Sequence, residues 1–189
     1  MPYAYGYVLA ALWLGWLGYW IVASGGVKPV ARSESWQSRL AYSVPLWVAA
    51  VLLIRRNFPG FLDERFLPAR DWIVILGLVL TAAGHAFAIW ARRTLGRNWS
   101  AEVTVKQDHE LIETGPYALA RHPIYTGLSL AFVGTAIAIG EWRAVAAALI
   151  AVASFWYKLG IEERLMSETF GAAYDTYRRK VKALIPFLL

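Results

Sequence analysis

Cysteine is absent from this chain of 189 residues, and charged residues make up only 17% of it. The lack of cysteine excludes disulfide bonds, thiolate metal sites and a cysteine nucleophile. A globular domain with a fully hydrated surface carries nearer to about 25% charged residues. Because 58% of the residues here are hydrophobic, the chain is predicted to be a membrane protein.

Five apolar runs are predicted to cross the bilayer, since about 20 such residues span roughly 30 Å of hydrocarbon. The second run is short and contains Pro45, which predicts a kink or support from neighbouring helices. Only Gly140 and Glu141 separate the last two runs, which predicts an antiparallel helical hairpin. The fold class is therefore an all-α polytopic membrane bundle of about five transmembrane helices, over residues 7–24, 39–54, 71–91, 123–140 and 142–160.

Basic residues are divided unevenly between the two ends of these runs. The end with the 25–38 loop, the 92–122 loop and the C-terminal tail carries 14 of the 19 Lys and Arg residues, although several arginines lie at 55–70 on the other end. Since cytoplasmic segments retain basic residues, a cytoplasmic C-terminus is predicted. The compactness of the chain indicates a bacterial protein, which would lie in the inner membrane. The net charge of +6 is spread along membrane-flanking segments, which favours lipid headgroups and not nucleic acid as its partner.

Polar residues crowd together just before the fourth apolar run, in GPYALARHPIYTG at 115–127. Pro123 begins a helix well and pushes His122 out of helical geometry, so His122 is predicted to lie at the mouth of the helix. The preceding 92–122 loop is long for a membrane domain and is expected to be functional, with a short extended piece at 102–105. Taken singly, Arg121, His122 and the nearby tyrosines are better explained by headgroup binding, helix capping and interfacial anchoring than by a site.

A second charged pair occurs where the fifth run ends. Lys158 and Glu162 are four residues apart and share one helix face, whereas Glu163 points about 100° away. An alternative is that Lys158 reaches the headgroups and the glutamates begin a solvated segment. Together with the RHP segment, the pair indicates a pocket open both to water and to the bilayer.

The remaining polar and aromatic residues are assigned no chemistry. His85, in the third run, is expected to be neutral and hydrogen-bonded to a neighbouring helix. Trp and Tyr near the ends of the runs are expected to anchor the protein at the lipid interface. Residues after Glu163 form an amphipathic pattern interrupted by Gly171, and the final LIPFLL is expected to fold back on the protein or the lipid.

Two separated motifs resemble the isoprenylcysteine carboxyl methyltransferase family of integral membrane enzymes. They are HELIETGPYALARHPIYTG at 109–127 and EERLMSETFGAAYDTYRRKVKALIPF from 162. The resemblance covers roughly residues 92–189 and implies S-adenosyl-L-methionine as methyl donor, bound in a cytoplasmic pocket formed by this C-terminal half. It divides the chain into N-terminal transmembrane helices at 1–91 and a methyltransferase core at 92–189.

The resemblance also implies roles for individual residues. Glu162 belongs to the cofactor site, and the position four before it, Lys158, contacts the acceptor's carboxylate. The eukaryotic members have arginine at that position, and lysine lacks the paired donors of a guanidinium, so the acceptor's reactive group stays open. The implied cofactor residues are His109, Leu111, Ile112, Tyr117, His122, Pro123, Tyr125 and Glu162.

The chemistry expected of such a site is alignment of an acceptor with an already activated methyl group. A carboxylate acceptor needs no base, whereas an amine or phenol would need Glu162 or His122 to remove a proton. The partners expected are the bilayer and a lipophilic acceptor. Phospholipid N-methyltransferases and membrane sterol-type reductases, which use NADPH, are the alternatives with similar motifs, and a protein that only binds anionic lipid is a third.

Overall fold

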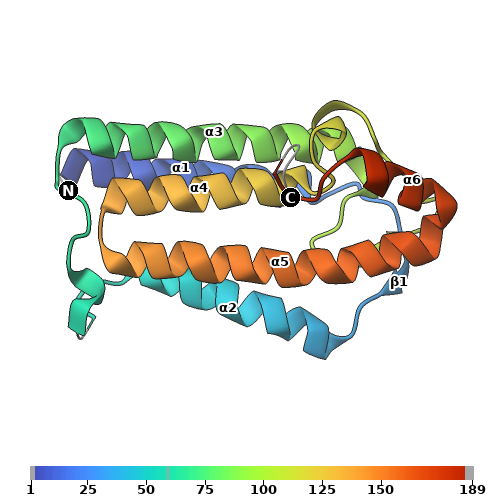
Figure 1. Cartoon of the computed structure of the whole chain (residues 1–189), viewed down its shortest axis with the longest axis horizontal. Coiled ribbons are helices and arrows are strands. Elements are labelled where there is room, and N and C mark those ends of the chain that lie inside the picture. The colour runs from blue at the N-terminus through green and yellow to red at the C-terminus, as the bar shows by residue number, and fades with distance from the viewer. Residues whose placement is uncertain (1–2, 59, 186–189) are drawn as a thin grey trace.

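The computed structural model describes residues 3–58 and 60–185, and its long helices lie side by side with their axes nearly parallel (Figure 1). The all-α fold predicted from the apolar runs is confirmed. The elements are α1 (Tyr3–Ala23), β1 (Val30–Ser33), α2 (Trp36–Ile54), η1 (Gly60–Asp63), α3 (Asp71–Leu95), η2 (Gly96–Asn98), β2 (Thr104–Lys106), η3 (Gly115–Ala118), α4 (Pro123–Ile139), α5 (Trp142–Phe170) and α6 (Ala172–Lys180).

Each of the five predicted spans corresponds to a helix. Among the described residues, α1, α2, α3 and α5 are long and apolar enough to cross a membrane, while α4 is a shorter apolar helix of 17 residues. The count of five crossings therefore stays a prediction. Pro45 lies inside α2, which continues through it, and Gly140 ends α4 in a left-handed conformation that suits glycine.

The closest helix packing joins the antiparallel pair α3 and α4. Small residues face one another along both helices, and a Cβ added to Gly84 would lie 2.4 Å from the carbonyl oxygen of Gly127. The helices are equally close further along the pair, where a Cβ added to Gly134 would lie 2.5 Å from the backbone nitrogen of Thr81. Glycine lets the two backbones approach, and this contact replaces the hydrophobic driving force that lipid removes.

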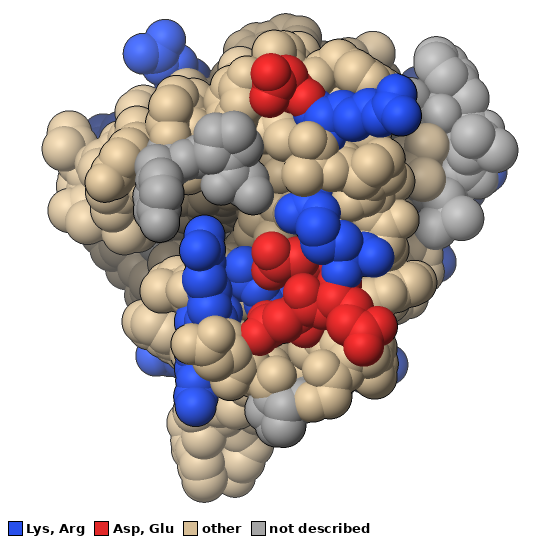
Figure 2. Space-filling view, turned by 90° about the vertical axis from the view of Figure 1, so that its left-hand side faces the viewer, with Lys and Arg blue, Asp and Glu red and all other residues tan. Residues whose placement is uncertain are grey.

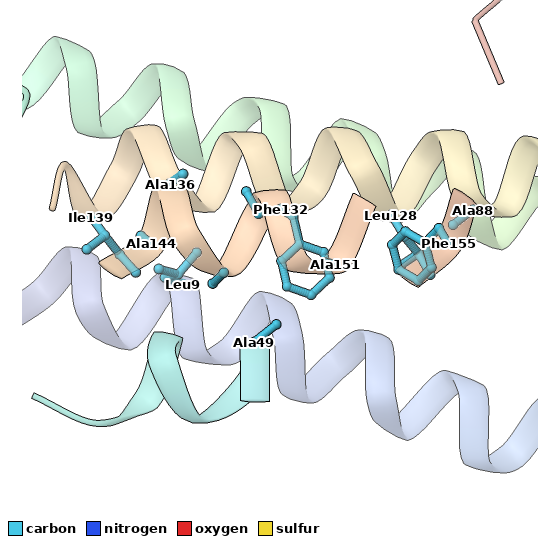
Figure 3. Close-up of a cluster of buried hydrophobic side chains, with 12 residues drawn as sticks. Leu9, Ala49, Ala88, Leu128, Phe132, Ala136, Ile139, Ala144, Ala151 and Phe155 are labelled. Atoms are coloured by element: carbon cyan, nitrogen blue, oxygen red, sulfur yellow. The ribbon is translucent and has the colours of Figure 1, made fainter. Parts of the chain in front are cut away.

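A second seam of small residues lies on α5, within the main core of the bundle. Ala144, Ala147 and Ala151 are fully buried, and Phe132 and Phe155 fill the space nearer the other end of the seam (Figure 3). Their rings lie 6.2 Å apart in an edge-to-face arrangement. The alanines bring the helices together, and the larger rings form the base of the functional site.

Ion pairs close the end of the bundle at which the α4–α5 hairpin turns. Figure 2 shows acidic and basic side chains side by side on this end. Arg143 is 2% exposed, pairs with Asp63 at 3.3 Å and Glu141 at 2.7 Å, and donates to the carbonyls of Leu52 and Leu53 at the end of α2. Because such arginines bind within the fold, their presence at this end has a structural reason beyond membrane orientation.

The opposite end carries a small antiparallel sheet. Strand β1, from the α1–α2 linker, pairs with β2 through Arg32 opposite Val105 and Ser33 opposite Thr104. The extended piece predicted at 102–105 is present one or two residues later, but its partner strand was not predicted. The linker thereby covers the polar loop that follows α3.

The C-terminal segment lies against the start of α4. The backbone nitrogens of Arg121 and His122 donate to the carbonyls of Lys182 and Ala183, at 2.9 and 3.0 Å. Leu184 is buried, as expected of a tail that folds back on the protein. The remainder of the apolar tail, residues 186–189, lies outside the described part of the chain.

Candidate functional site

A cavity of about 430 Å³ lies at the end of the bundle where the polar loop, α6 and the C-terminal segment meet. Its walls come from α1, α4 and α5, from the segments at 95–104 and 109–112, and from α6. Residues far apart in sequence, such as Trp16 and Tyr177, line the same space. A volume in this range is typical of sites for small molecules and cofactors.

Most of the residues singled out from the sequence line this cavity. Pro123 does not: it is buried at the first position of α4, where it sets the direction of the helix. The lining residues among those predicted are His109, Leu111, Ile112, Tyr117, His122, Tyr125, Lys158 and Glu162.

Glu162 is held by two side chains from the start of α4. His122 Nδ1 lies 3.2 Å from Oε2 of Glu162, and the hydroxyl of Tyr125 donates to Oε1. The rings of His122 and Tyr125 are stacked 5.8 Å apart, and Tyr125 stacks on Phe155 at 5.3 Å. The carboxylate is thus fixed at the edge of an aromatic stack that leads into the apolar part of the cavity.

Glu163 was expected to point away from the pair formed by Lys158 and Glu162, and it does, but towards a second set of partners. Its Oε1 accepts from His122 Nε2, Arg121 Nε and the Tyr174 hydroxyl, each at 2.8 Å. Arg121 also donates Nη2 to Oε2 at 3.0 Å, which makes the ion pair bidentate. The sequence signals were the adjacent glutamates and the RHP segment, whose pairing the sequence alone did not indicate.

His122 therefore lies between two carboxylates and is 8% exposed. Burial lowers the pKa of His122, but its hydrogen bonds to Glu162 and Glu163 and the negative charges of these residues raise the pKa by more than burial lowers it. The pKa of His122 therefore lies above its ordinary value of 6.5. A neutral imidazole donates from one nitrogen only, whereas both nitrogens face carboxylates here. The geometry therefore favours the doubly protonated imidazolium.

Lys158 extends into the cavity from α5, on the same face as Glu162. Its ammonium donates to the Ala101 carbonyl at 2.6 Å and lies 4.7 Å from the ring centre of Tyr42 and 5.7 Å from that of Tyr125. Within the described chain this is its one hydrogen bond, although an ammonium has three donors. The remaining donors suit an anionic group.

Three tryptophans of α1 form the apolar wall, although the sequence-based predictions gave them no role in a site. Trp13, Trp16 and Trp20 line the cavity together with Phe132 and Phe155. Trp13 packs on Phe132 with ring centres 5.0 Å apart, and its Nε1 donates to Thr135 at 3.1 Å. Their spacing of three to four residues on one helix was the available signal.

The expectation for His85 is wrong in one respect. The ring is buried, at 4% exposed, between Trp13 and Trp16, but neither ring nitrogen has a hydrogen-bond partner among the described residues. Aromatic contacts, and not a bond to a neighbouring helix, hold this side chain. His85 does not line the cavity.

The site therefore combines two kinds of surface in one cavity. One end carries Lys158, Glu162 and His122, while aromatic and aliphatic side chains form the other. His109 lines the cavity near the α5–α6 junction, where its ring packs edge-on against Phe170 at 5.5 Å. Such a cavity is suited to a molecule with a charged end and an apolar end.

The model of the phospholipid methyltransferase family matches residues 72–173. Among known proteins, the chain is 26% identical to protein-S-isoprenylcysteine O-methyltransferase B of Arabidopsis thaliana over 82% of this chain and 76% of that protein. It is 31% identical to protein-S-isoprenylcysteine O-methyltransferase of Saccharomyces cerevisiae over 69% of this chain and 56% of that protein.

A solved structure is also similar, that of the eukaryotic intramembrane Ras methyltransferase ICMT, isoprenylcysteine carboxyl methyltransferase. The match has a TM-score of 0.57 and 28% identity, and covers 84% of this chain. The chain spans 55% of the length of that protein.

Proposed function

This chain belongs to the phospholipid methyltransferase family, and from that premise we propose that it transfers a methyl group from S-adenosyl-L-methionine to the polar end of a lipid-like acceptor. The resemblance to isoprenylcysteine carboxyl methyltransferases predicted from the two motifs is confirmed by the similar proteins. The chain is an integral membrane protein of that type. The methyl donor, the acceptor and the residues that bind each of them are proposals.

One observation supports the proposal most strongly: a single cavity joins a buried charged group to an aromatic wall within a membrane helical bundle. Ionisable residues are costly at membrane depth and mark functional sites there. A lipid-binding protein without chemistry needs a cation for the headgroup, but it does not need Glu162 held by two further side chains. The arrangement favours an enzyme.

The residues present fit S-adenosyl-L-methionine. The cavity has a suitable size, Glu162 suits the cofactor's cationic groups, and Tyr117, Tyr125 and the His109–Ile112 segment offer aromatic and apolar contacts. The cofactor supplies a methyl group on a positively charged sulfur, which leaves as a neutral thioether. In this proposal His122 and Tyr125 hold Glu162 in place so that its carboxylate orients the donor.

A carboxylate is the acceptor group that the site supports best. An amine or phenol must lose a proton, but His122 faces a carboxylate on each ring nitrogen and has no free site to accept one. Lys158 has donors left to hold an anion, and Phe155 and the α1 tryptophans exclude water from the apolar end. The acceptor's tail enters from the lipid between helices.

We further propose the orientation predicted from the charges, with the C-terminus in the cytoplasm of a bacterial cell. The cavity then opens at the cytoplasmic end of the bundle, where a water-soluble donor is available. This placement is supported by the basic residues at that end, since cytoplasmic segments retain Lys and Arg.

The test is calorimetric titration of the detergent-purified protein with S-adenosylhomocysteine, beside Glu162→Ala and His122→Ala. We expect binding in the wild type that weakens at least about tenfold in both variants, the effect of losing a charge-assisted hydrogen bond. Transfer of labelled methyl groups to S-farnesylthioacetic acid, compared with phosphatidylethanolamine, then tests the acceptor. Binding of NADPH without S-adenosylhomocysteine would overturn the proposal in favour of a reductase, and methylation of the amine alone would overturn the carboxylate.

A further inference from the structure

Lys158 and Glu162 have opposite charges, share one helix face and line the same cavity, yet they do not pair in the described structure. At a spacing of four residues such a pair normally meets. Glu162 is instead bound by His122 and Tyr125, and Lys158 donates to Ala101. The other partners of Glu162 and Lys158 must therefore explain why this carboxylate and this ammonium do not form an ion pair.

His122 provides the charge that takes the place of Lys158. As the imidazolium it supplies a counter-charge to Glu162 at 3.2 Å, so the carboxylate does not draw Lys158 towards it. A buried imidazolium in turn needs a counter-charge, and Glu163 supplies it at 2.8 Å on the other ring nitrogen. Charges thus alternate from Arg121 to Glu163, His122 and Glu162.

Among the described residues, no other charged group contacts His122 directly. Its own neighbour Arg121 and, on α6, Tyr174 and Arg178 reach it only through Glu163. Tyr125 stacks on the ring from α4, and the C-terminal segment contributes the carbonyls of Lys182 and Ala183 to the backbone nitrogens of Arg121 and His122. Glu162 and Lys158 complete the set on α5.

We propose that Glu163 is a positioning residue: by holding His122 in its charged form it gives Glu162 a counter-charge and leaves Lys158 available for the anionic end of the acceptor. Glu163 does not line the cavity and acts through His122. The proposal rests on the proposed function for the acceptor and goes beyond it by assigning control of acceptor binding to a residue outside the cavity.

Glu163→Gln separates charge from structure. With its oxygen at the Oε1 position, the glutamine still accepts from His122 Nε2, Arg121 Nε and Tyr174, but it carries no negative charge and its NH2 faces Arg121 Nη2. We expect the KM for S-farnesylthioacetic acid to equal that of the wild type at pH 6, and to rise about tenfold by pH 8 as His122 loses its proton and Lys158 turns to Glu162. The wild-type KM stays level over this range, and kcat changes less than KM in the variant.

The control is Glu168→Gln, on the same helix and exposed in its pair with Arg32, which should change neither the KM nor its pH dependence. NMR titration of the histidine ring signals, assigned with His122→Gln, needs no activity, and it should show His122 titrating at lower pH in Glu163→Gln. An unchanged titration, or a rise in KM that is equal at pH 6 and pH 8, overturns the positioning role. If the wild type does not bind S-adenosylhomocysteine, the proposed function itself is contradicted.

Discussion

At the scale of single residues, the charged side chains of the site pair with one another, except for Lys158. Glu162, Glu163, His122 and Arg121 form a network in which each charge has an opposite neighbour. Lys158 is 9% exposed, and a backbone carbonyl and two aromatic rings surround its ammonium. Among the described residues no carboxylate forms an ion pair with this ammonium, which is the state expected of a group that binds an anionic ligand.

Lys158→Met should therefore lower function without lowering stability. We expect kcat/KM for S-farnesylthioacetic acid to fall about 10- to 100-fold, since a hydrogen bond to a charged group contributes about 1.5–3 kcal/mol. The melting temperature should stay level or rise, because methionine fills the same space without an uncompensated charge. Lys180→Met, at an exposed position of α6, is the control, and a melting temperature that falls with Lys158→Met alone would contradict this account.

His122 makes stability depend on pH. Because its pKa is raised in the folded protein above its ordinary value of 6.5, the stability that its ion pairs contribute is fully present below about pH 6.5 and is lost as the pH rises through the raised pKa. The difference in melting temperature between the wild type and His122→Gln should be largest near pH 6 and shrink towards pH 9. Thermal unfolding at several pH values measures this, and a difference that grows with pH would show that the sign is wrong.

At the scale of elements, the tight α3–α4 pair forms a rigid part of the bundle. Glycines on both helices permit backbone contact, and Thr81 adds hydrogen bonds to the carbonyls of Gly77 and Ala131 within the same interface. The start of α4 carries His122 and Tyr125, so the position of these side chains depends on how α4 is held.

Gly84→Ala should disrupt this interface. The new methyl group would lie 2.4 Å from the Gly127 carbonyl oxygen and 2.6 Å from the Ala131 nitrogen, so backbone must move. We expect the free energy of unfolding to fall by about 1–3 kcal/mol or more, measured by thermal unfolding in one detergent. Gly15→Ala on α1, where no atom lies within 4 Å, is the matched control and should change it by less than about 0.5 kcal/mol. Equal effects of the two substitutions would contradict the packing argument.

At the scale of the whole molecule, the two ends of the bundle have separate tasks. The cavity lies at the end with α6 and β1, and the ion pairs around Arg143 tie the α4–α5 hairpin to η1 and the end of α2 at the other (Figures 1 and 2). The first 91 residues contribute the tryptophan wall and the linker that covers the polar loop. The division into helices at 1–91 and a core at 92–189 stays a prediction, with the addition that both parts line the cavity.

Removing the Arg143 side chain should therefore affect stability and not ligand binding. Arg143→Ala leaves the carboxylates of Asp63 and Glu141 without this partner, so we expect a loss of about 3–5 kcal/mol in the free energy of unfolding. Below the melting temperature, calorimetry should give an unchanged affinity for S-adenosylhomocysteine. Arg56→Ala, exposed at the same end, should change neither quantity. A weakened affinity in Arg143→Ala would show that the two ends are coupled.

Much of this site was predictable because its residues belong to local patterns. The proline after His122 places that ring at a helix mouth, and the four-residue spacing places Lys158 and Glu162 on one face. The tryptophans of α1 were given no role in a site because an aromatic residue in an apolar run is equally suited to contact with lipid and to a cavity wall. Glu163 was passed over because its partners lie about 40 residues away, on elements whose relative position the spacing does not specify.

Hydrophobic length, proline and glycine act on the local backbone, so the amino-acid sequence was enough to predict a membrane protein, the runs that become helices and the polar residues at their ends. Three features became visible only in the folded chain: His122 lies between Glu162 and Glu163, α1 forms a wall of the cavity, and Lys158 does not pair with Glu162. Those outcomes depend on how closely helices approach and on which buried charge compensates which. The physical reason is that electrostatic and packing energies depend on distances in space, whereas a sequence specifies only distances along the chain.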